Sequence, residues 1–320
     1  MKGVFLDLNT VDRGDLELEP LRQALPEWDF FQQTAPESIA ERIRDAQVVV
    51  TNKVVLDAAT IASSPSLQLV CAAATGTNNI DLTAANARAI PVCNARNYAT
   101  DSVVQHVFAL LLTLVTRMDA YRADIRAGRW SASDQFCLLD HPIRTLAGMH
   151  LGIVGFGVLG QATARMAEAF GMRVSIAGSL RVDTKGADDR APLDTLLPQL
   201  DALSLHCPLT DRTRNLIDSR RLALMPRNSL LINTARGGLV DASALAASLR
   251  SGHLGGAGID VLDPEPPPAT HPLLATDIPN LILTPHTAWA ARSARQNVLD
   301  EVRANIQAFL AGTPRNVVAP

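Results

Sequence analysis

The chain has 320 residues, which is enough for about two domains that each bury their own core. Hydrophobic residues make up 47% and charged residues 19%, a balance typical of compact globular proteins rather than disordered ones. The net charge of −3, with no Lys/Arg block, argues against nucleic acid as a partner, and four scattered cysteines argue against disulfides and a metal site.

Short β-rich runs alternate with helical patterns along the chain, which is the signature of parallel α/β sheets. Residues 1–7 lack the apolar core and cleavage site of a secretory signal, so we expect a cytoplasmic protein. Three strands of a first domain are expected at residues 3–6, 46–50 and 67–71. A long helix is expected at residues 102–126, and its apolar stretch contains Gln105 and His106 and is too short and polar for a membrane span.

Residues 128–148 form an irregular segment that could be a dimer arm or a crossing between domains. A second α/β unit follows, and six strands are expected at residues 149–155, 172–176, 202–205, 229–232, 257–260 and 281–283. Six strands suit one nucleotide-binding sheet. A helix expected at residues 292–310 would return to the first domain. The sequence therefore predicts two doubly wound parallel-sheet domains.

A glycine-rich turn separates the first of these six strands from a helix expected at residues 161–170. Its sequence is Gly155-Phe156-Gly157-Val158-Leu159-Gly160. Gly155 permits a tight turn, Gly157 lets the backbone approach a pyrophosphate, and Gly160 lets the helix pack closely on the strand. The helix N-terminus would offer N–H groups to the phosphates. The pattern predicts a dinucleotide site, with an unliganded glycine turn as the alternative.

The acidic residue that binds the ribose of NAD about 20 residues further on is missing. The strand expected there ends at Gly178, and Ser179 and Arg181 follow within three residues. An uncharged strand end followed by an arginine tolerates a 2′-phosphate and could bind it. We therefore expect NADP or NAD, with NADP slightly favoured; a solvated Arg181 is the alternative.

Three later motifs each place one charged or titratable side chain at a strand end or in a loop. Arg236 could bind the carboxylate or carbonyl oxygen of an oxo acid, because its planar fork matches such groups. His286 has a candidate partner in Glu265, and a carboxylate bonded to an imidazole favours the protonated ring. A protonated imidazole beside a nicotinamide suits a general acid for hydride transfer to a carbonyl. Each residue alone could be structural.

Together these motifs resemble the D-2-hydroxyacid dehydrogenase family, and the resemblance covers essentially the whole chain. It implies a Rossmann-type nucleotide domain, residues 100–287, inserted into a flavodoxin-like substrate domain, residues 1–99 and 288–320. It also implies that Arg236 holds the substrate, Glu265 tunes the histidine and His286 is the acid/base. Further cofactor contacts are implied for His206, Cys207, Pro208, Thr213, Thr234, Ala235, Asp260 and His286, of which Asp260 would hold the nicotinamide carboxamide.

The first domain contributes substrate contacts by the same resemblance. The N–H groups of Thr75 and Gly76 would hold the substrate carboxylate, and Lys53 could add a cation, although it could equally be a solvated lysine. Residues 98–106 and 287–290 look most like the glycerate dehydrogenase branch. Gln105 stands where many members carry Glu, so it is given no catalytic role.

The expected reaction is reduction of a small 2-oxo acid, such as hydroxypyruvate or glyoxylate, to the D-2-hydroxy acid. The alternatives are a D-lactate or phosphonate dehydrogenase, or a corepressor of the same fold that binds the dinucleotide without turnover. A homodimer is expected, and neither a membrane nor a nucleic acid.

Overall fold

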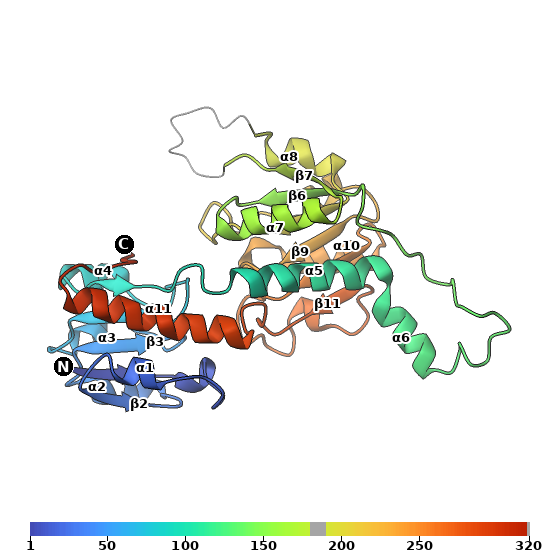
Figure 1. The fold of residues 1–320 in the computed structure, drawn as a ribbon. Coiled ribbons are helices and arrows are strands. Elements are labelled where there is room, and N and C mark those ends of the chain that lie inside the picture. The colour runs from blue at the N-terminus through green and yellow to red at the C-terminus, as the bar shows by residue number, and fades with distance from the viewer. Residues whose placement is uncertain (180–189, 319–320) are drawn as a thin grey trace. The chain divides into compact units, whose positions relative to one another are not determined.

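The structure, a computed structural model, describes residues 1–179 and 190–318 and consists of two compact units. The first unit comprises Met1–Ala99 and Trp289–Pro320, and the second comprises Thr100–Ala288. Each unit has a parallel sheet covered by helices, which confirms the predicted fold class (Figure 1).

The first unit contains a five-stranded parallel sheet in the order β2-β1-β3-β4-β5. Its strands are β1 (Lys2–Phe5), β2 (Glu27–Phe30), β3 (Val48–Thr51), β4 (Leu69–Ala72) and β5 (Val92–Cys93). Its helices are α1 (Glu19–Arg22), α2 (Ile39–Ile43), α3 (Ala58–Ala62), α4 (Leu82–Ala87) and α11 (Arg292–Leu310), with 3-10 turns at Leu8–Thr10 and Pro36–Ser38. The chain leaves β1 to one side for β2 and to the other side for β3, so the sheet is doubly wound.

The two outer strands of this sheet were not predicted. β2 pairs with one neighbour only, and its residues are half-buried or exposed, so it lacks the apolar run by which buried parallel strands are found. Trp28 and Phe30 stack on each other, with ring centroids 5.0 Å apart. β5 has only two residues, too few for a pattern.

Alternate residues of the inner strands enter two hydrophobic clusters on opposite faces of the sheet. Val4 and Val49 belong to the cluster that includes α2 and α3, whereas Phe5 and Val50 belong to the cluster that includes α11. This alternation follows from the pleat of the strands. Because both faces are covered by helices, the strands are apolar throughout.

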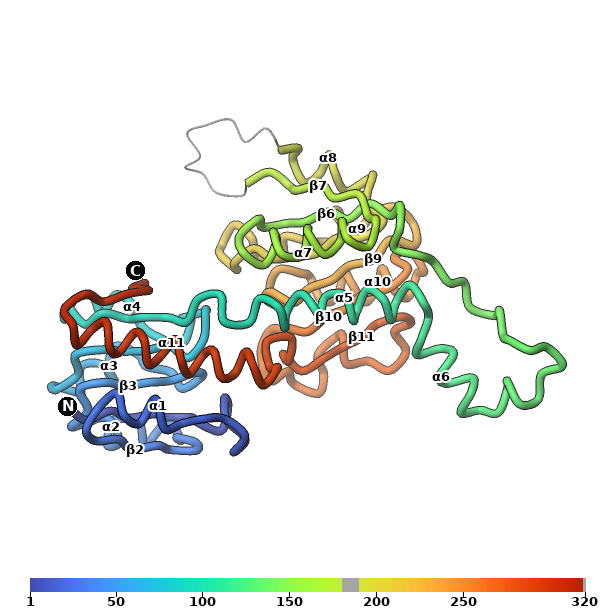
Figure 2. Tube along the Cα trace, in the orientation of Figure 1, coloured from blue at the N-terminus to red at the C-terminus, as the bar shows by residue number. Residues whose placement is uncertain are grey.

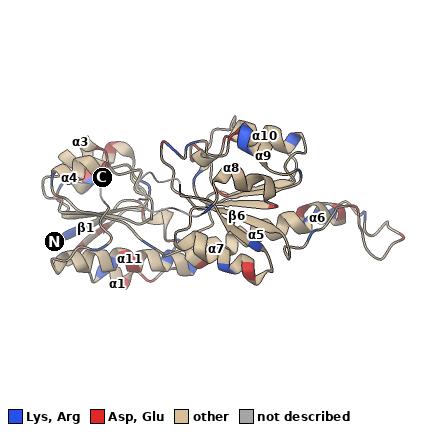
Figure 3. Cartoon of the chain, turned by 90° about the horizontal axis from the view of Figure 1, so that it is seen from above, with Lys and Arg blue, Asp and Glu red and all other residues tan. Residues whose placement is uncertain are grey.

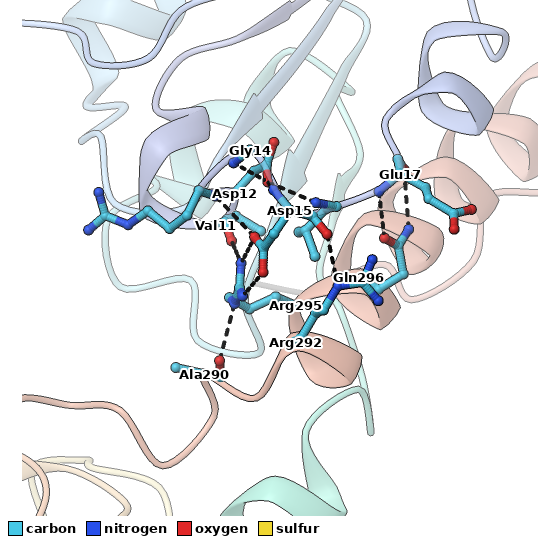
Figure 4. Close-up of polar contacts among 11 residues, drawn as sticks. Val11, Asp12, Gly14, Asp15, Glu17, Ala290, Arg292, Arg295 and Gln296 are labelled. Carbon is cyan, nitrogen blue, oxygen red and sulfur yellow. Dashed lines mark hydrogen bonds and ion pairs between the residues drawn. The ribbon is translucent and has the colours of Figure 1, made fainter.

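The start of α11 is tied to a loop near the N-terminus of the chain (Figure 4). The Arg295 guanidinium contacts both carboxylate oxygens of Asp15, at 2.8 and 2.6 Å. Arg295 also donates to the Val11 carbonyl, and Arg292 donates to the Asp15 carbonyl. The Arg295 guanidinium lowers the pKa of Asp15 to about 2.

The second unit contains a six-stranded parallel sheet in the order β11-β10-β9-β8-β6-β7, and its six strands match the predicted set. They are β6 (His150–Val154), β7 (Arg173–Ile176), β8 (Ala202–Leu205), β9 (Leu230–Asn233), β10 (Gly256–Ile259) and β11 (Leu281–Leu283). After β6 the chain adds β7 on one side of this strand and β8 to β11 on the other side, so the order of strands reverses between β6 and β8. Ligands of doubly wound sheets bind at such a switch point, outside the carboxyl ends of the strands.

Helices cover both faces of this sheet, as the view in Figure 3 shows. They are α5 (Thr100–Thr116), α6 (Met118–Arg126), α7 (Val158–Ala169), α8 (Leu193–Leu196), α9 (Ser219–Leu224) and α10 (Ala242–Arg250), with 3-10 turns at Leu197–Gln199, Gly237–Leu239 and Pro272–Leu274. One core cluster joins α5 and α7 to the sheet, and another joins α8, α9 and α10 to it. Basic and acidic residues are interspersed over the helices (Figure 3).

The long helix expected at residues 102–126 is interrupted at Arg117. This residue is left-handed, with φ 54°, so the helical hydrogen-bond ladder cannot continue through it, and α5 and α6 meet at a bend of 60°. Over the described residues no single helix could cross a membrane, although this bent pair passes the test of length and composition when taken together. The segment predicted to be irregular, residues 128–148, has no helix or strand (Figure 2).

Candidate active site

The glycine turn lies at the switch point of the second unit, between the ends of β6 and β8. Gly155 has φ +93°, and a Cβ there would lie 2.6 Å from the backbone nitrogen of Cys207. A Cβ on Gly160 would lie 2.1 Å from the Gly155 carbonyl oxygen. These two positions require glycine because α7 packs directly against the turn and the turn packs against the next strand.

Gly157 has a different environment, because a Cβ there would meet no atom within 4 Å. This open backbone lies at the N-terminus of α7, where N–H groups face outward. Phe156 and Val158 are exposed and Leu159 is half-buried. The turn therefore has the shape that a dinucleotide pyrophosphate needs.

Two polar atoms at neighbouring strand ends are buried without a partner in the described part of the chain. They are Nδ1 of His206, after β8, and Oγ1 of Thr234, after β9. Buried polar atoms are normally hydrogen-bonded, so unpaired ones at the carboxyl ends of the strands fit a bound polar ligand. Together with the open Gly157, they indicate that this edge of the sheet suits a dinucleotide.

The loop after β8 is held by side chains of the strand end and of the loop itself. The His206 Nε2 atom lies 2.9 Å from Oγ of Ser204, and burial lowers the pKa of His206 to about 4. Cys207 is buried, and burial raises the pKa of its thiol to about 11. Pro208 is exposed, and its carbonyl accepts a hydrogen bond from the buried Thr213 hydroxyl at 2.8 Å.

The strand β7 ends in uncharged residues, as the sequence indicated. Gly178 and Ser179 are half-buried, and the Gly178 N–H donates to the Ala191 carbonyl at 2.9 Å. Arg181 lies outside the described residues.

Arg236 is presented by a loop that a buried asparagine shapes. The Asn233 side chain accepts from the Ala235 N–H at 3.0 Å and donates to the Arg236 carbonyl at 2.8 Å. The Arg236 side chain is half-buried and donates to the Ala235 carbonyl at 2.7 Å. Asn233 thus fixes the backbone on both sides of Ala235, which sets the direction in which Arg236 leaves the sheet.

The loop after β10 crosses the Arg236 loop at close range. A Cβ on Gly237 would lie 2.1 Å from the Leu262 carbonyl carbon, so the two backbones touch. Arg214 pairs with Asp263 at 3.1 Å, and the Leu262 N–H donates to Oε1 of Glu265 at 2.9 Å. Glu265 is therefore anchored through one of its two carboxylate oxygens.

The other carboxylate oxygen of Glu265 faces the imidazole of His286. Oε2 lies 2.6 Å from Nδ1 of His286, which is a short, strong contact. The Glu265 side chain is 35% exposed and the His286 side chain is 27% exposed, so a small molecule can reach both. His286 is left-handed, with φ 54°. This geometry leaves its Nε2 atom as the nitrogen that can exchange a proton with a substrate.

Asp260 holds the loop that carries His286. Its side chain is fully buried, and Oδ1 accepts from the Thr284 hydroxyl at 2.5 Å and from the Thr287 N–H at 2.9 Å. Oδ2 accepts from the Ala288 N–H at 2.9 Å, and the Asp260 carbonyl accepts from the His286 N–H at 2.7 Å. Its contact to a carboxamide stays a prediction.

In the first unit, a buried carboxylate organises the end of β3. Asp7 accepts from the N–H groups of Asn52, Lys53 and Val54, at 2.9, 2.6 and 3.2 Å. Burial raises the pKa of Asp7, and these three hydrogen bonds oppose the rise. Lys53 is exposed. The backbone from which Lys53 projects is thus fixed.

Thr75 and Gly76 follow the neighbouring strand β4. The Thr75 hydroxyl donates to the Ala95 carbonyl at 2.9 Å, and the Thr75 carbonyl accepts from the Asn94 side chain at 2.7 Å. Within residues 1–179 and 190–318, no acceptor is found for the N–H groups of Thr75 and Gly76. Two adjacent N–H donors of this kind suit a carboxylate.

The structure thus brings Arg236, Glu265 and His286 to one edge of the second sheet, after β9, β10 and β11, which are neighbours. Sequence reasoning missed the side chains that hold them, above all Asn233 and the loop-holding role of Asp260. A buried polar residue at the end of an apolar strand was the available signal. No group of three or more potential metal ligands is found among the described residues.

Comparison with known proteins gives one family over most of the second unit. Residues 108–288 match the D-isomer specific 2-hydroxyacid dehydrogenase, NAD binding domain. The chain is 44% identical to a glycerate dehydrogenase of Methylorubrum extorquens over 319 residues, covering 99% of this chain and 98% of that one.

Solved structures with the same fold carry nicotinamide dinucleotides. An acyclic imino acid reductase in complex with NADPH and D-arginine has a TM-score of 0.86 at 25% identity, covering 99% of this chain and 100% of that one. A D-lactate dehydrogenase from Aquifex aeolicus, complexed with NAD and lactic acid, has a TM-score of 0.80 at 28% identity, covering 97% and 96%.

Proposed function

The chain belongs to the D-isomer specific 2-hydroxyacid dehydrogenases, and on that premise we propose that it reduces hydroxypyruvate or glyoxylate to the D-2-hydroxy acid. The observation that carries this proposal is the 2.6 Å contact between His286 Nδ1 and Glu265 Oε2, at the same sheet edge as Arg236. The likeness to a glycerate dehydrogenase along the whole chain supports hydroxypyruvate as the first substrate to test.

His286 acts as the general acid in the proposed reduction. The Glu265 carboxylate holds Nδ1 and stabilises the imidazolium, so the Nε2 proton is delivered to the carbonyl oxygen as negative charge develops there. Glu265 stays in place because the Leu262 N–H holds its second oxygen. Arg236 stabilises the same oxygen by charge.

The residues of the glycine turn are proposed to hold the dinucleotide, which supplies the hydride when bound. Gly157 and the N-terminus of α7 would hold its pyrophosphate, while His206 Nδ1 and Thr234 Oγ1, which have no partner among the described residues, would contact the dinucleotide. Cys207, Pro208, Thr213 and Ala235 belong to the loops that shape this edge, and Asp260 is proposed to contact the carboxamide.

We propose NADPH as the preferred form, because the residues after β7, among them Gly178 and Ser179, lack the acid that binds a free ribose hydroxyl. Arg181 is proposed to bind the 2′-phosphate, on the sequence alone. Arg181→Ala should then lower the affinity for NADPH more than the affinity for NADH. An equal loss of affinity for both would contradict this assignment.

Residues of the first unit are proposed to bind the substrate carboxylate. The N–H groups of Thr75 and Gly76 have no acceptor in the described structure, and Lys53 adds a positive charge on a backbone fixed by Asp7. A carboxylate needs such donors because burying it without them is costly.

The test is the initial rate of NADPH and NADH oxidation with hydroxypyruvate and glyoxylate. His286→Ala should lower kcat by about a hundredfold to ten-thousandfold, the usual contribution of a general acid, while dinucleotide binding persists. His253→Ala, a half-buried histidine of the same unit whose ring contacts the Leu222 carbonyl, is the matched control. Near-normal turnover by His286→Ala would refute the proposed mechanism.

We further propose a homodimer that uses residues 128–148. This segment leaves the body of the second unit and exposes several large apolar side chains that a second copy of the chain could cover (Figure 2). These are Trp130, Phe136, Leu139 and Ile143. Phe136→Asp combined with Leu139→Asp should give a monomer in sedimentation, and an unchanged mass would count against the proposal. We also propose the cytoplasm as the compartment, which cell fractionation would test.

A further inference from the structure

The loop that carries His286 is held from a second side, by the first two turns of α5. His106 Nε2 lies 2.9 Å from Oγ1 of Thr284 and 3.5 Å from Oδ1 of Asp260. One turn earlier, the Ser102 hydroxyl donates to the Ala288 carbonyl at 2.6 Å. α5 therefore contacts this loop before and after His286.

The direction of these hydrogen bonds follows from the chemistry of the groups. A carboxylate only accepts, so the single Thr284 hydroxyl proton goes to Asp260 at 2.5 Å. The Thr284 oxygen must then accept from His106, which places a proton on Nε2 of His106. The result is a directed relay of two bonds, from α5 through Thr284 to the buried carboxylate.

The backbone at His286 explains why such support is needed. A φ of 54° is uncommon for a residue with a side chain, and such conformations persist where the surroundings fix them. Asp260 fixes the loop through Thr284, Thr287 and Ala288. Thr284 is where the α5 contact and the Asp260 contact meet.

We propose that His106 is a positioning residue for the reaction, which acts through Thr284 and Asp260 on the placement of His286. The inference rests on the proposed role of His286 as the acid. His106 does not touch the reacting atoms in this scheme. Removing its hydrogen bond loosens the strand end from which the imidazole projects, and small misplacements of a catalytic group lower the rate strongly.

The experiment compares His106→Leu, which removes the donor, with His106→Gln, which keeps an N–H donor on a side chain of similar reach. His106→Leu should lower kcat for hydroxypyruvate by about tenfold to a hundredfold, with little change in KM, dinucleotide affinity or circular dichroism. His106→Gln should recover most of the loss. His253→Leu is the matched control and should leave kcat near the wild-type value.

A second pair of variants tests the relay itself. Thr284→Val removes the hydroxyl at constant shape and should reduce kcat by a factor similar to that of His106→Leu, while Thr284→Ser should be mild. Because both changes break one chain of bonds, the double variant His106→Leu/Thr284→Val should be no worse than the worse single one.

Full activity of His106→Leu, an equal loss in His106→Gln, or strictly multiplicative losses in the double variant would each overturn the proposal. If His106→Leu does not fold, the comparison of Thr284→Val with Thr284→Ser decides alone. His286→Ala distinguishes failure of the proposed function from failure of this proposal. Turnover by His286→Ala would refute the proposed function. If His286→Ala is inactive and His106→Leu is fully active, only the role of His106 is refuted.

Discussion

His206 should lower the free energy of unfolding of the second unit as pH falls below about 6.5, before most carboxylates are protonated. Burial lowers the pKa of this histidine from its ordinary value of 6.5 to about 4. Among the described residues its buried Nδ1 atom has no partner, and Nε2 contacts Ser204, so the charged imidazolium would lose the solvation that it has in the unfolded chain.

The sign and size follow from proton linkage. Below pH 6.5 the unfolded chain binds a proton that the folded one does not, so the free energy of unfolding falls as pH falls and levels off below about 4. Each tenfold change in proton affinity is worth about 1.4 kcal/mol, so the whole depression corresponds to about 3 kcal/mol. Between about pH 7.5 and about pH 5, His206 alone should account for about 2 kcal/mol.

The assay is urea unfolding followed by circular dichroism at these two pH values, without dinucleotide. His206→Gln should show a pH dependence that is shallower than that of the wild type by about 2 kcal/mol. His253→Gln controls for the loss of a histidine elsewhere in the same unit. If the free energy of unfolding of His206→Gln and of the wild type falls by the same amount over this range, His206 is not the cause.

Four further substitutions should give distinct results. Glu265→Gln keeps an oxygen beside Nδ1 of His286 but removes its negative charge, so kcat should fall while dinucleotide affinity is kept; an unchanged kcat would count against the pairing. Gly157→Ala should keep the melting temperature but weaken the dinucleotide by about tenfold or more, whereas Gly160→Ala should destabilise the unit because its Cβ would lie 2.1 Å from a carbonyl oxygen. The wild type should melt at a higher temperature than Asp15→Asn, and this difference should disappear as pH falls from about 4 towards about 2. The reason is that the lowered pKa of Asp15 favours folding only while the carboxylate is ionised. A difference in melting temperature that stays constant over this range would contradict the prediction.

The elements that could be predicted from sequence are those whose pattern is local. The run 150–154 and the glycines after it define a strand, a turn and a helix within about 20 residues, and the structure has all three. β2 was missed because an edge strand carries polar residues on its open side. The break at Arg117 was missed because a left-handed arginine has no signature in the apolar spacing of the helix.

The proposed catalytic residues could be found from local sequence patterns, whereas the residues that hold them in place could not. Arg236, Glu265 and His286 each stand in a recognisable motif, so their candidacy needed no coordinates. His106 is separated from Thr284 by 178 positions, and only the packing of α5 against β9 and β10 brings the two together. On sequence alone, His106 was indistinguishable from a structural or solvated histidine.

The contact between α11 and the N-terminal loop has a consequence for biosynthesis. The first unit draws its core from both Met1–Ala99 and the helix that begins at Arg292, which contributes Val298, Val302 and Ile306 to it. On the ribosome, the second unit is therefore complete before the first one is. Until α11 emerges, one face of the first sheet stays uncovered, and this nascent stage is where chaperones would be expected to bind.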